Sequence, residues 1–141
     1  MSSSTSTIVN GFHYVNTGAF VNLGPGKSGV LGVPLLTGTG DLSAGSGTGF
    51  TLQLSNAFPL QPVTLFVSLT AGAAPFKGGT FIPVPIITTL SFTTDILGGL
   101  TLPALMPAGT PSLSFVLQSW CADPLATFGL SGSNGLQCIM P

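Results

Sequence analysis

Residues 112–118 read Ser-Leu-Ser-Phe-Val-Leu-Gln, with apolar side chains at positions 113, 115 and 117. Residues 51–55, Thr-Leu-Gln-Leu-Ser, show the same alternation. Successive side chains of a β-strand point to opposite faces, so a period of two predicts strands with one buried face. The two stretches therefore indicate antiparallel sheet whose apolar face is covered by another layer.

Similar short runs, rich in β-branched and aromatic residues and bounded by Gly, Pro, Asn or Ser, recur along the whole chain. They predict strands at Thr7–Asn10, His13–Leu23, Val30–Leu36, Gly49–Ser55, Val63–Thr70, Thr80–Pro85, Leu90–Thr94, Gly99–Leu105, Ser112–Ala122 and Gly135–Met140. Such strands, with almost no helix-forming residues between them, predict an all-β fold, an antiparallel β-sandwich or jelly roll.

The segments between these strands define the expected organisation. Residues 37–49, rich in Gly, Ser and Thr, are predicted to form a flexible loop. Asn10-Gly11 and Asn134-Gly135 are predicted to form turns that use positive φ angles. Residues 1–30 differ slightly in composition from the rest, and we interpret them as an N-terminal arm that precedes a β-sandwich domain at residues 31–141.

Charge is almost absent from the chain. An ordinary soluble domain has about a quarter of its residues charged, whereas five of these 141 residues are: Lys27, Asp41, Lys77, Asp95 and Asp123. The net charge of −1 and the lack of a basic cluster argue against nucleic-acid binding. The longest apolar stretch, residues 81–106, is interrupted by Pro, Gly and Asp, so no membrane-spanning segment is expected.

Catalytic and metal-binding groups are equally sparse. His13 is the single histidine, and no Gly-x-Ser-x-Gly elbow supports a Ser-His-Asp triad. Residues 24–29, Gly-Pro-Gly-Lys-Ser-Gly, lack the Walker spacing and a following helix, so we interpret them as a turn with a solvated Lys27. The scattered Cys, His and Asp residues lack the paired spacing of a zinc site, and single carboxylates in separate loops disfavour calcium. We therefore expect no enzymatic activity, no catalytic residues, no cofactor and no metal.

Cys121 and Cys138 lie in the last two predicted strands, which a loop beginning at Asp123 joins. Cross-strand Cβ distances of about 4.5–5.5 Å come close to disulfide geometry. Two main arrangements stay open: a disulfide that closes the final hairpin, or two buried free thiols. Intermolecular pairing is a third.

The end of the chain carries a further pattern. Gln118, Trp120 and Asp123-Pro124 are followed by a small-residue loop and by Ser133-Asn134-Gly135-Leu136. Together with residues 31–34 (Leu-Gly-Val-Pro) and 50–57 (Phe-Thr-Leu-Gln-Leu-Ser-Asn-Ala), this order resembles a β-sandwich domain that recurs at the C-termini of large secreted proteins of planctomycetes and related environmental bacteria. The resemblance covers residues 31–141 and implies an extracellular, non-enzymatic domain. Independently, a carboxylate at Asp123, just before a proline, is expected to cap backbone N–H groups of a turn.

The scarcity of charge favours a structural function. Monomeric proteins defend their edge strands with Lys, Glu or Pro, and this chain has almost no charge to use in that way. We expect a self-assembling subunit of an extracellular filament, fibre or surface layer, secreted or at the cell surface although no signal peptide is visible in this chain. Its partner would be another copy, joined by a strand from the arm. The residues expected to carry that strand are Ile8, Val9, Phe12, Tyr14, Val15, Phe20 and Val21.

Two alternatives stay open beside this interpretation. One is a secreted adhesion or carbohydrate-binding module, in which Trp120 would stack on a glycan. The other is a viral or phage coat or fibre protein, which would share the fold class and the self-assembly.

Overall fold

A computed structural model describes residues 6–9, 12–15 and 17–141, with side chains described from residue 17 onward. The strands are β1 (Ser6–Val9), β2 (Phe12–Val15), β3 (Ala19–Gly24), β4 (Leu35–Gly40), β5 (Phe50–Ser55), β6 (Pro62–Ser68), β7 (Ala71–Phe76), β8 (Gly79–Pro83), β9 (Thr88–Thr93), β10 (Leu100–Ala104), β11 (Ser114–Ala122), β12 (Leu130–Gly132) and β13 (Gly135–Ile139). A single 3-10 turn, η1 (Thr127–Gly129), is the only helical element of the described residues. The predicted all-β fold is confirmed.

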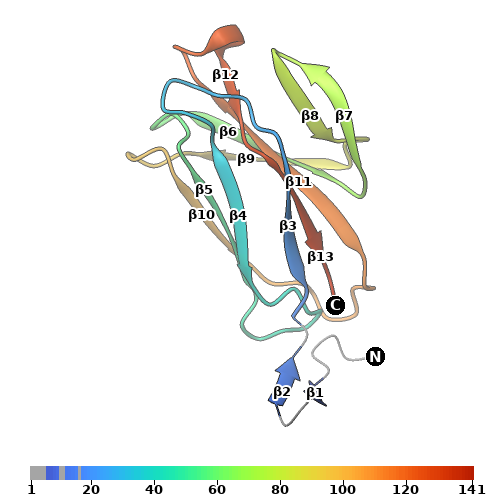
Figure 1. The fold of residues 1–141 in the computed structure, drawn as a ribbon. Coiled ribbons are helices and arrows are strands. Elements are labelled where there is room, and N and C mark those ends of the chain that lie inside the picture. Colours follow the sequence, from blue (N-terminus) through green and yellow to red (C-terminus); the bar gives the residue numbers. More distant parts are fainter. Residues whose placement is uncertain (1–5, 10–11, 16) are drawn as a thin grey trace.

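Two antiparallel sheets pack against each other (Figure 1). The larger sheet has the order β3-β13-β11-β6-β9, with β12 paired to β11. The smaller sheet has the order β10-β5-β4, and β7 and β8 form a separate hairpin. This arrangement is the predicted β-sandwich. Within the described residues, no helix is long and apolar enough to cross a membrane.

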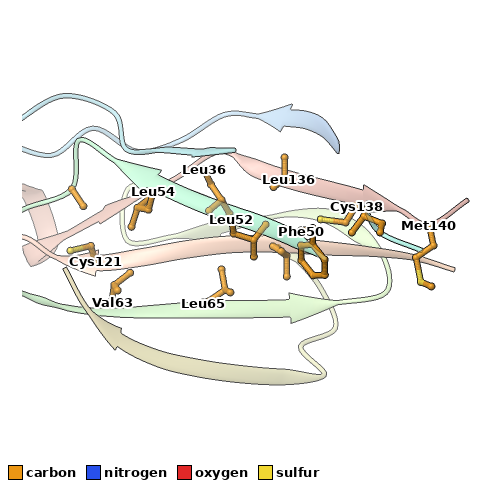
Figure 2. Packing of buried hydrophobic residues seen from close by; sticks show 13 residues of the cluster. Leu36, Phe50, Leu52, Leu54, Val63, Leu65, Cys121, Leu136, Cys138 and Met140 are labelled. Atoms are coloured by element: carbon orange, nitrogen blue, oxygen red, sulfur yellow. The ribbon is translucent and has the colours of Figure 1, made fainter. Parts of the chain in front are cut away.

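The hydrophobic core lies between the two sheets. Leu52 and Leu54 of β5 alternate with exposed Gln53, as the sequence period predicts. Val63 and Leu65 of β6 lie opposite them in the core, and Figure 2 shows these side chains between the strands. Burial of each such side chain stabilises the fold by about 1.5–3 kcal/mol.

Strand β4 corrects the sequence prediction. Its residues 37–40 come from the Gly/Ser/Thr tract that was predicted to be a loop, whereas Val30 to Pro34 form no extended strand. Residues 37–40 form a strand because their backbone pairs with residues 50–53 of β5, whereas residues 41–49 of the predicted loop contain no strand. Gly38 is required there, since a Cβ at this position would lie 2.2 Å from the Phe20 ring.

The β7–β8 hairpin contains a strand that the sequence did not indicate. Residues 71–76 read Ala-Gly-Ala-Ala-Pro-Phe and have low β-propensity. The hairpin closes at Lys77-Gly78, where both residues have positive φ (48° and 81°), as a two-residue type I′ turn demands. At the predicted Asn134-Gly135 turn neither residue has a positive φ, so that turn prediction was wrong.

The predicted arm divides into two parts. Residues 19–24 form β3, which pairs with β13 of the same chain, so Phe20 and Val21 lie in the sandwich's own sheet. Residues 6–15 contribute β1 and β2, which pair with one another, Val9 opposite Phe12. The predicted turn residues Asn10-Gly11 lie outside the described residues, as do the side chains of Ile8, Val9, Phe12, Tyr14 and Val15.

Candidate functional site

An apolar pocket lies between the two sheets, on the side where β9 and β10 form the sheet edges. It has a volume of about 370 Å³, within the range of ligand sites. Its lining comes from five strands and the segment after β10, and no lining residue is charged: Phe50, Leu52, Leu65, Val67, Leu90, Phe92, Leu102, Pro103, Ala104, Leu105, Met106, Phe115 and Leu117.

The pocket opens because the two sheets separate on this side. Strands β9 and β10 run in different directions from the loop at residues 94–99 that joins them (Figure 1). Leu90 on β9 is 47 % exposed and Leu105, just after β10, is 62 % exposed, although both line the pocket. The sandwich therefore leaves an apolar surface in contact with water here, an arrangement typical of a binding surface.

Both strands at the pocket are unpaired along one edge. β9 is the last strand of the larger sheet and β10 the last strand of the smaller one. β9 reads Thr-Thr-Leu-Ser-Phe-Thr, without charge or proline, so its outer backbone groups can pair with another strand. β10 contains Pro103, whose nitrogen cannot donate a hydrogen bond, so β9 is the more competent edge.

The opposite side of the sandwich is closed. There the edge strands β3 and β4 lie next to each other, and the Phe20 ring packs over Gly38. The centroids of the Phe20 and Phe50 rings are 6.4 Å apart, which fills the space between the sheets. Phe20 is thus part of its own sandwich, whereas Val21 is 39 % exposed on the outer face.

Two of the five charged residues are buried, which corrects the expectation for Lys27. Lys27 is 7 % exposed, and its Nζ donates hydrogen bonds to the carbonyl oxygens of Thr127 and Leu130. Asp123 is 1 % exposed and accepts hydrogen bonds from the N–H groups of Val30 and Leu125. Asp123 therefore caps backbone N–H groups, as predicted. The two residues join the loop before β4 to the loop after β11.

The polar residues Gln118 and Asn134 of the C-terminal pattern hold neighbouring strands together through hydrogen bonds to backbone groups. Gln118 Oε1 accepts from Ile82 N–H, and Gln118 Nε2 donates to the carbonyls of Thr80 and Ser133. The Asn134 side chain accepts from Leu36 N–H and donates to the Leu36 carbonyl, in the manner of a backbone partner. Gln118 therefore fixes β8 to the larger sheet, and Asn134 fixes β4 to β13.

Trp120 lies on the face of β11 that is turned away from the main core. It is 4 % exposed and packs edge-to-face with Phe76 (centroids 4.9 Å apart) and against Phe81 (6.4 Å), both from the β7–β8 hairpin. A buried ring cannot stack on a glycan. An exposed Trp120 ring, which would favour a carbohydrate-binding surface at this residue, is therefore not observed.

The structure has Cys121 and Cys138 as buried free thiols. The short strand β12 pairs with the end of β11, placing Ser131 opposite Cys121, while β13 pairs with its beginning, placing Cys138 opposite Phe115. Phe115 precedes Cys121 by six residues, which is about 20 Å along a strand. A disulfide requires Cα atoms within about 7 Å. Of the two main arrangements that the sequence left open, the structure therefore has the two buried free thiols and not the disulfide.

Burial of these thiols predicts an alkaline loss of stability. Burial raises the pKa of Cys138 from 9.0 to about 12. Between these pH values the unfolded state loses a proton that the folded state keeps, so the free energy of unfolding falls by about 1.4 kcal/mol per pH unit. Urea unfolding of wild type and Cys138→Ala at several pH values between 9 and 11.5 measures this slope. The variant should show the shallower slope; equal slopes would contradict the assignment.

No group of three or more His, Cys, Asp or Glu side chains converges within the part of the chain that the structure describes. His13, with Tyr14, lies where side chains are not described.

The pocket itself was not predicted from the sequence. The signal for its lining was present, since Leu90-Ser91-Phe92 alternates in a predicted strand, but alternation indicates only that Leu90 and Phe92 share a face. That the sheets separate at this face depends on how their strands cross.

The fold and the site together define an all-β sandwich with an apolar pocket between two free sheet edges. No protein-family model, curated protein or solved structure matches the chain.

Proposed function

We propose that the chain is a non-enzymatic structural subunit that assembles with further copies of itself through its uncharged strand edges. The observation that carries this proposal is the position of the pocket between β9 and β10, two edges without a charged residue. A free edge with an adjoining apolar surface offers both backbone hydrogen bonds and hydrophobic burial to a strand of another molecule.

The distribution of charge supports self-association. Lys27 and Asp123 are buried, so the surface of residues 17–141 carries three charged side chains, those of Asp41, Lys77 and Asp95. Asp95 lies in the β9–β10 loop and Lys77 in the β7–β8 turn, so neither charge is on an edge strand. Little electrostatic repulsion opposes contact between copies.

The setting of this assembly is proposed to be extracellular or at the cell surface, as a filament, fibre or surface layer. The support for this setting is the resemblance of residues 31–141 to C-terminal domains of large secreted planctomycete proteins. A viral or phage coat protein would use the same contacts.

Assembly is tested by adding charge at the pocket. In Leu90→Lys a cation replaces an apolar side chain of the pocket lining. Burying it between copies costs about 3 kcal/mol, which raises the dissociation constant about a hundredfold. Gln53→Lys is the matched control, because it adds the same charge at an exposed position of β5, which lies between β4 and β10 and has no free edge. Sedimentation velocity and negative-stain electron microscopy compare the variants with wild type.

Wild type and Gln53→Lys should form polymers, and Leu90→Lys should sediment as a monomer of about 14.1 kDa. A wild-type protein that stays monomeric at millimolar concentration would overturn the proposed function.

A further inference from the structure

We propose that strand β2 of a second copy occupies the pocket, pairing with β9 along the strand that carries Phe12 and Tyr14. This inference rests on the proposed function and names the segment that makes the contact. A strand of one copy that completes the sandwich of the next produces a head-to-tail contact, which generates an open chain or a ring.

The first argument is that β2 has an unused edge. In the described part of the chain, β1 and β2 form a two-stranded sheet of their own, and β2 pairs only with β1. An isolated two-stranded hairpin is at best marginally stable in water, whereas addition to a larger sheet stabilises it. β9 is the matching unpaired edge, and pairing β2 with it would extend the larger sheet without opening the hairpin.

The second argument is the fit between the hairpin and the pocket. Phe12 and Tyr14 are two residues apart in β2, so they belong to the same, apolar face of the strand. The pocket lining contains no charged residue, and residues 1–18 of the chain contain no Asp, Glu, Lys or Arg. No charge is therefore buried when the strand enters.

The third argument is that β2 cannot reach β9 of its own chain. β2 ends at Val15 and β3 begins at Ala19, so at most about 14 Å of extended chain separates them. β3 and β9 are at opposite edges of the larger sheet, and a strand added beyond β9 would lie five strand spacings from β3, about 24 Å. The connection is too short for self-insertion, so the strand has to come from another copy.

A small apolar ligand is the competing occupant of the pocket, and the edges argue against it. Such a ligand would use the apolar lining and leave the backbone groups of β9 unpaired. A strand would fill the apolar lining and would also pair with the backbone groups of β9. The two occupants differ in what abolishes assembly, because only the strand requires residues 12–15.

The experiment mixes two full-length variants that are defective in complementary ways. The arm variant, Phe12→Lys with Tyr14→Lys, has an intact pocket, and the pocket variant, Leu90→Lys, has an intact arm. Lysine at both sites prevents the defective arm and the defective pocket from attracting one another. His13→Lys is the matched arm control, since this neighbour falls on the other face of an extended strand. Circular dichroism checks that each variant folds.

Each variant alone should sediment as a monomer, with at least a hundredfold weaker association than wild type, while His13→Lys should assemble normally. An equimolar mixture of the arm variant and the pocket variant should give a one-to-one heterodimer. This heterodimer should not grow further, because it contains one intact arm and one intact pocket, and these are already bound to each other. If the arm variant polymerises like wild type, or if the mixture stays monomeric, the arm is not the occupant. Self-assembly of wild type would in both cases still stand, so the two proposals fail separately.

Discussion

Replacing Gln118 with Leu is expected to lower the free energy of unfolding by about 3–5 kcal/mol. The side chain is fully buried, and its three hydrogen bonds serve Ile82 N–H and the carbonyls of Thr80 and Ser133. Leu fills a similar volume but bonds to none of these groups. Each buried backbone group left without a partner costs about 1–3 kcal/mol, part of which the added apolar burial offsets.

Thermal and urea unfolding of the full chain measure this loss, which corresponds to a fall in Tm of roughly 10–20 °C for a domain of this size. Gln53→Leu is the matched control, because it makes the same change at an exposed position of β5. That variant should differ from wild type by no more than about 0.5 kcal/mol. Equal stability of the two variants would show that the Gln118 bonds do not hold β8 to the sheet.

The alternation of apolar and polar residues in the sequence was sufficient to predict that the fold consists of two packed sheets. The alternation at residues 51–55 predicted which side chains face the core, and the structure buries Leu52 and Leu54 there. For residues 112–118 the prediction of one buried face was only partly right: Leu117 is in the core, but Gln118 on the other face is buried too and Leu113 is exposed. This signal is strong because a shift of one residue would expose the whole apolar set. The predicted β-sandwich follows from the same pattern.

The errors arose where tertiary contacts override local preference. Thr37 to Gly40 form a strand because β5 supplies partners and Phe20 covers Gly38. Residues 71–76 form a strand because the turn at Lys77-Gly78 and the contact with Trp120 hold them in place. Phe20 and Trp120 are distant in sequence from the strands they contact, so propensity alone could not predict either strand.

Lys27 shows the same limit for the candidate site. A lysine between glycines is typical of an exposed turn, and burial was not expected. Its ammonium group finds two carbonyls about a hundred residues away in sequence. The pocket likewise depends on the crossing of β9 and β10, which a strand pattern does not contain.

Replacing Trp120 with Ala is expected to lower the free energy of unfolding by about 3–5 kcal/mol, as for other buried aromatic side chains. The loss should be concentrated in the β7–β8 hairpin, because Phe76 and Phe81 pack on the Trp120 ring. Hydrogen exchange should therefore accelerate in residues 71–83 more than in β5. Phe128→Ala removes an aromatic ring that is 70 % exposed, and this control should leave stability nearly unchanged.

Trp120→Phe separates the packing of the ring from its polar group. The indole N–H of Trp120 is buried and has no hydrogen-bond acceptor among the described residues. A buried donor without a partner costs about 1–3 kcal/mol, so its removal offsets part of the lost ring volume. Trp120→Phe should thus be at least about 2 kcal/mol more stable than Trp120→Ala in urea unfolding. Equal losses in the two variants would mean that the N–H is bonded, and that the hairpin is held by the indole's polar edge rather than by its faces.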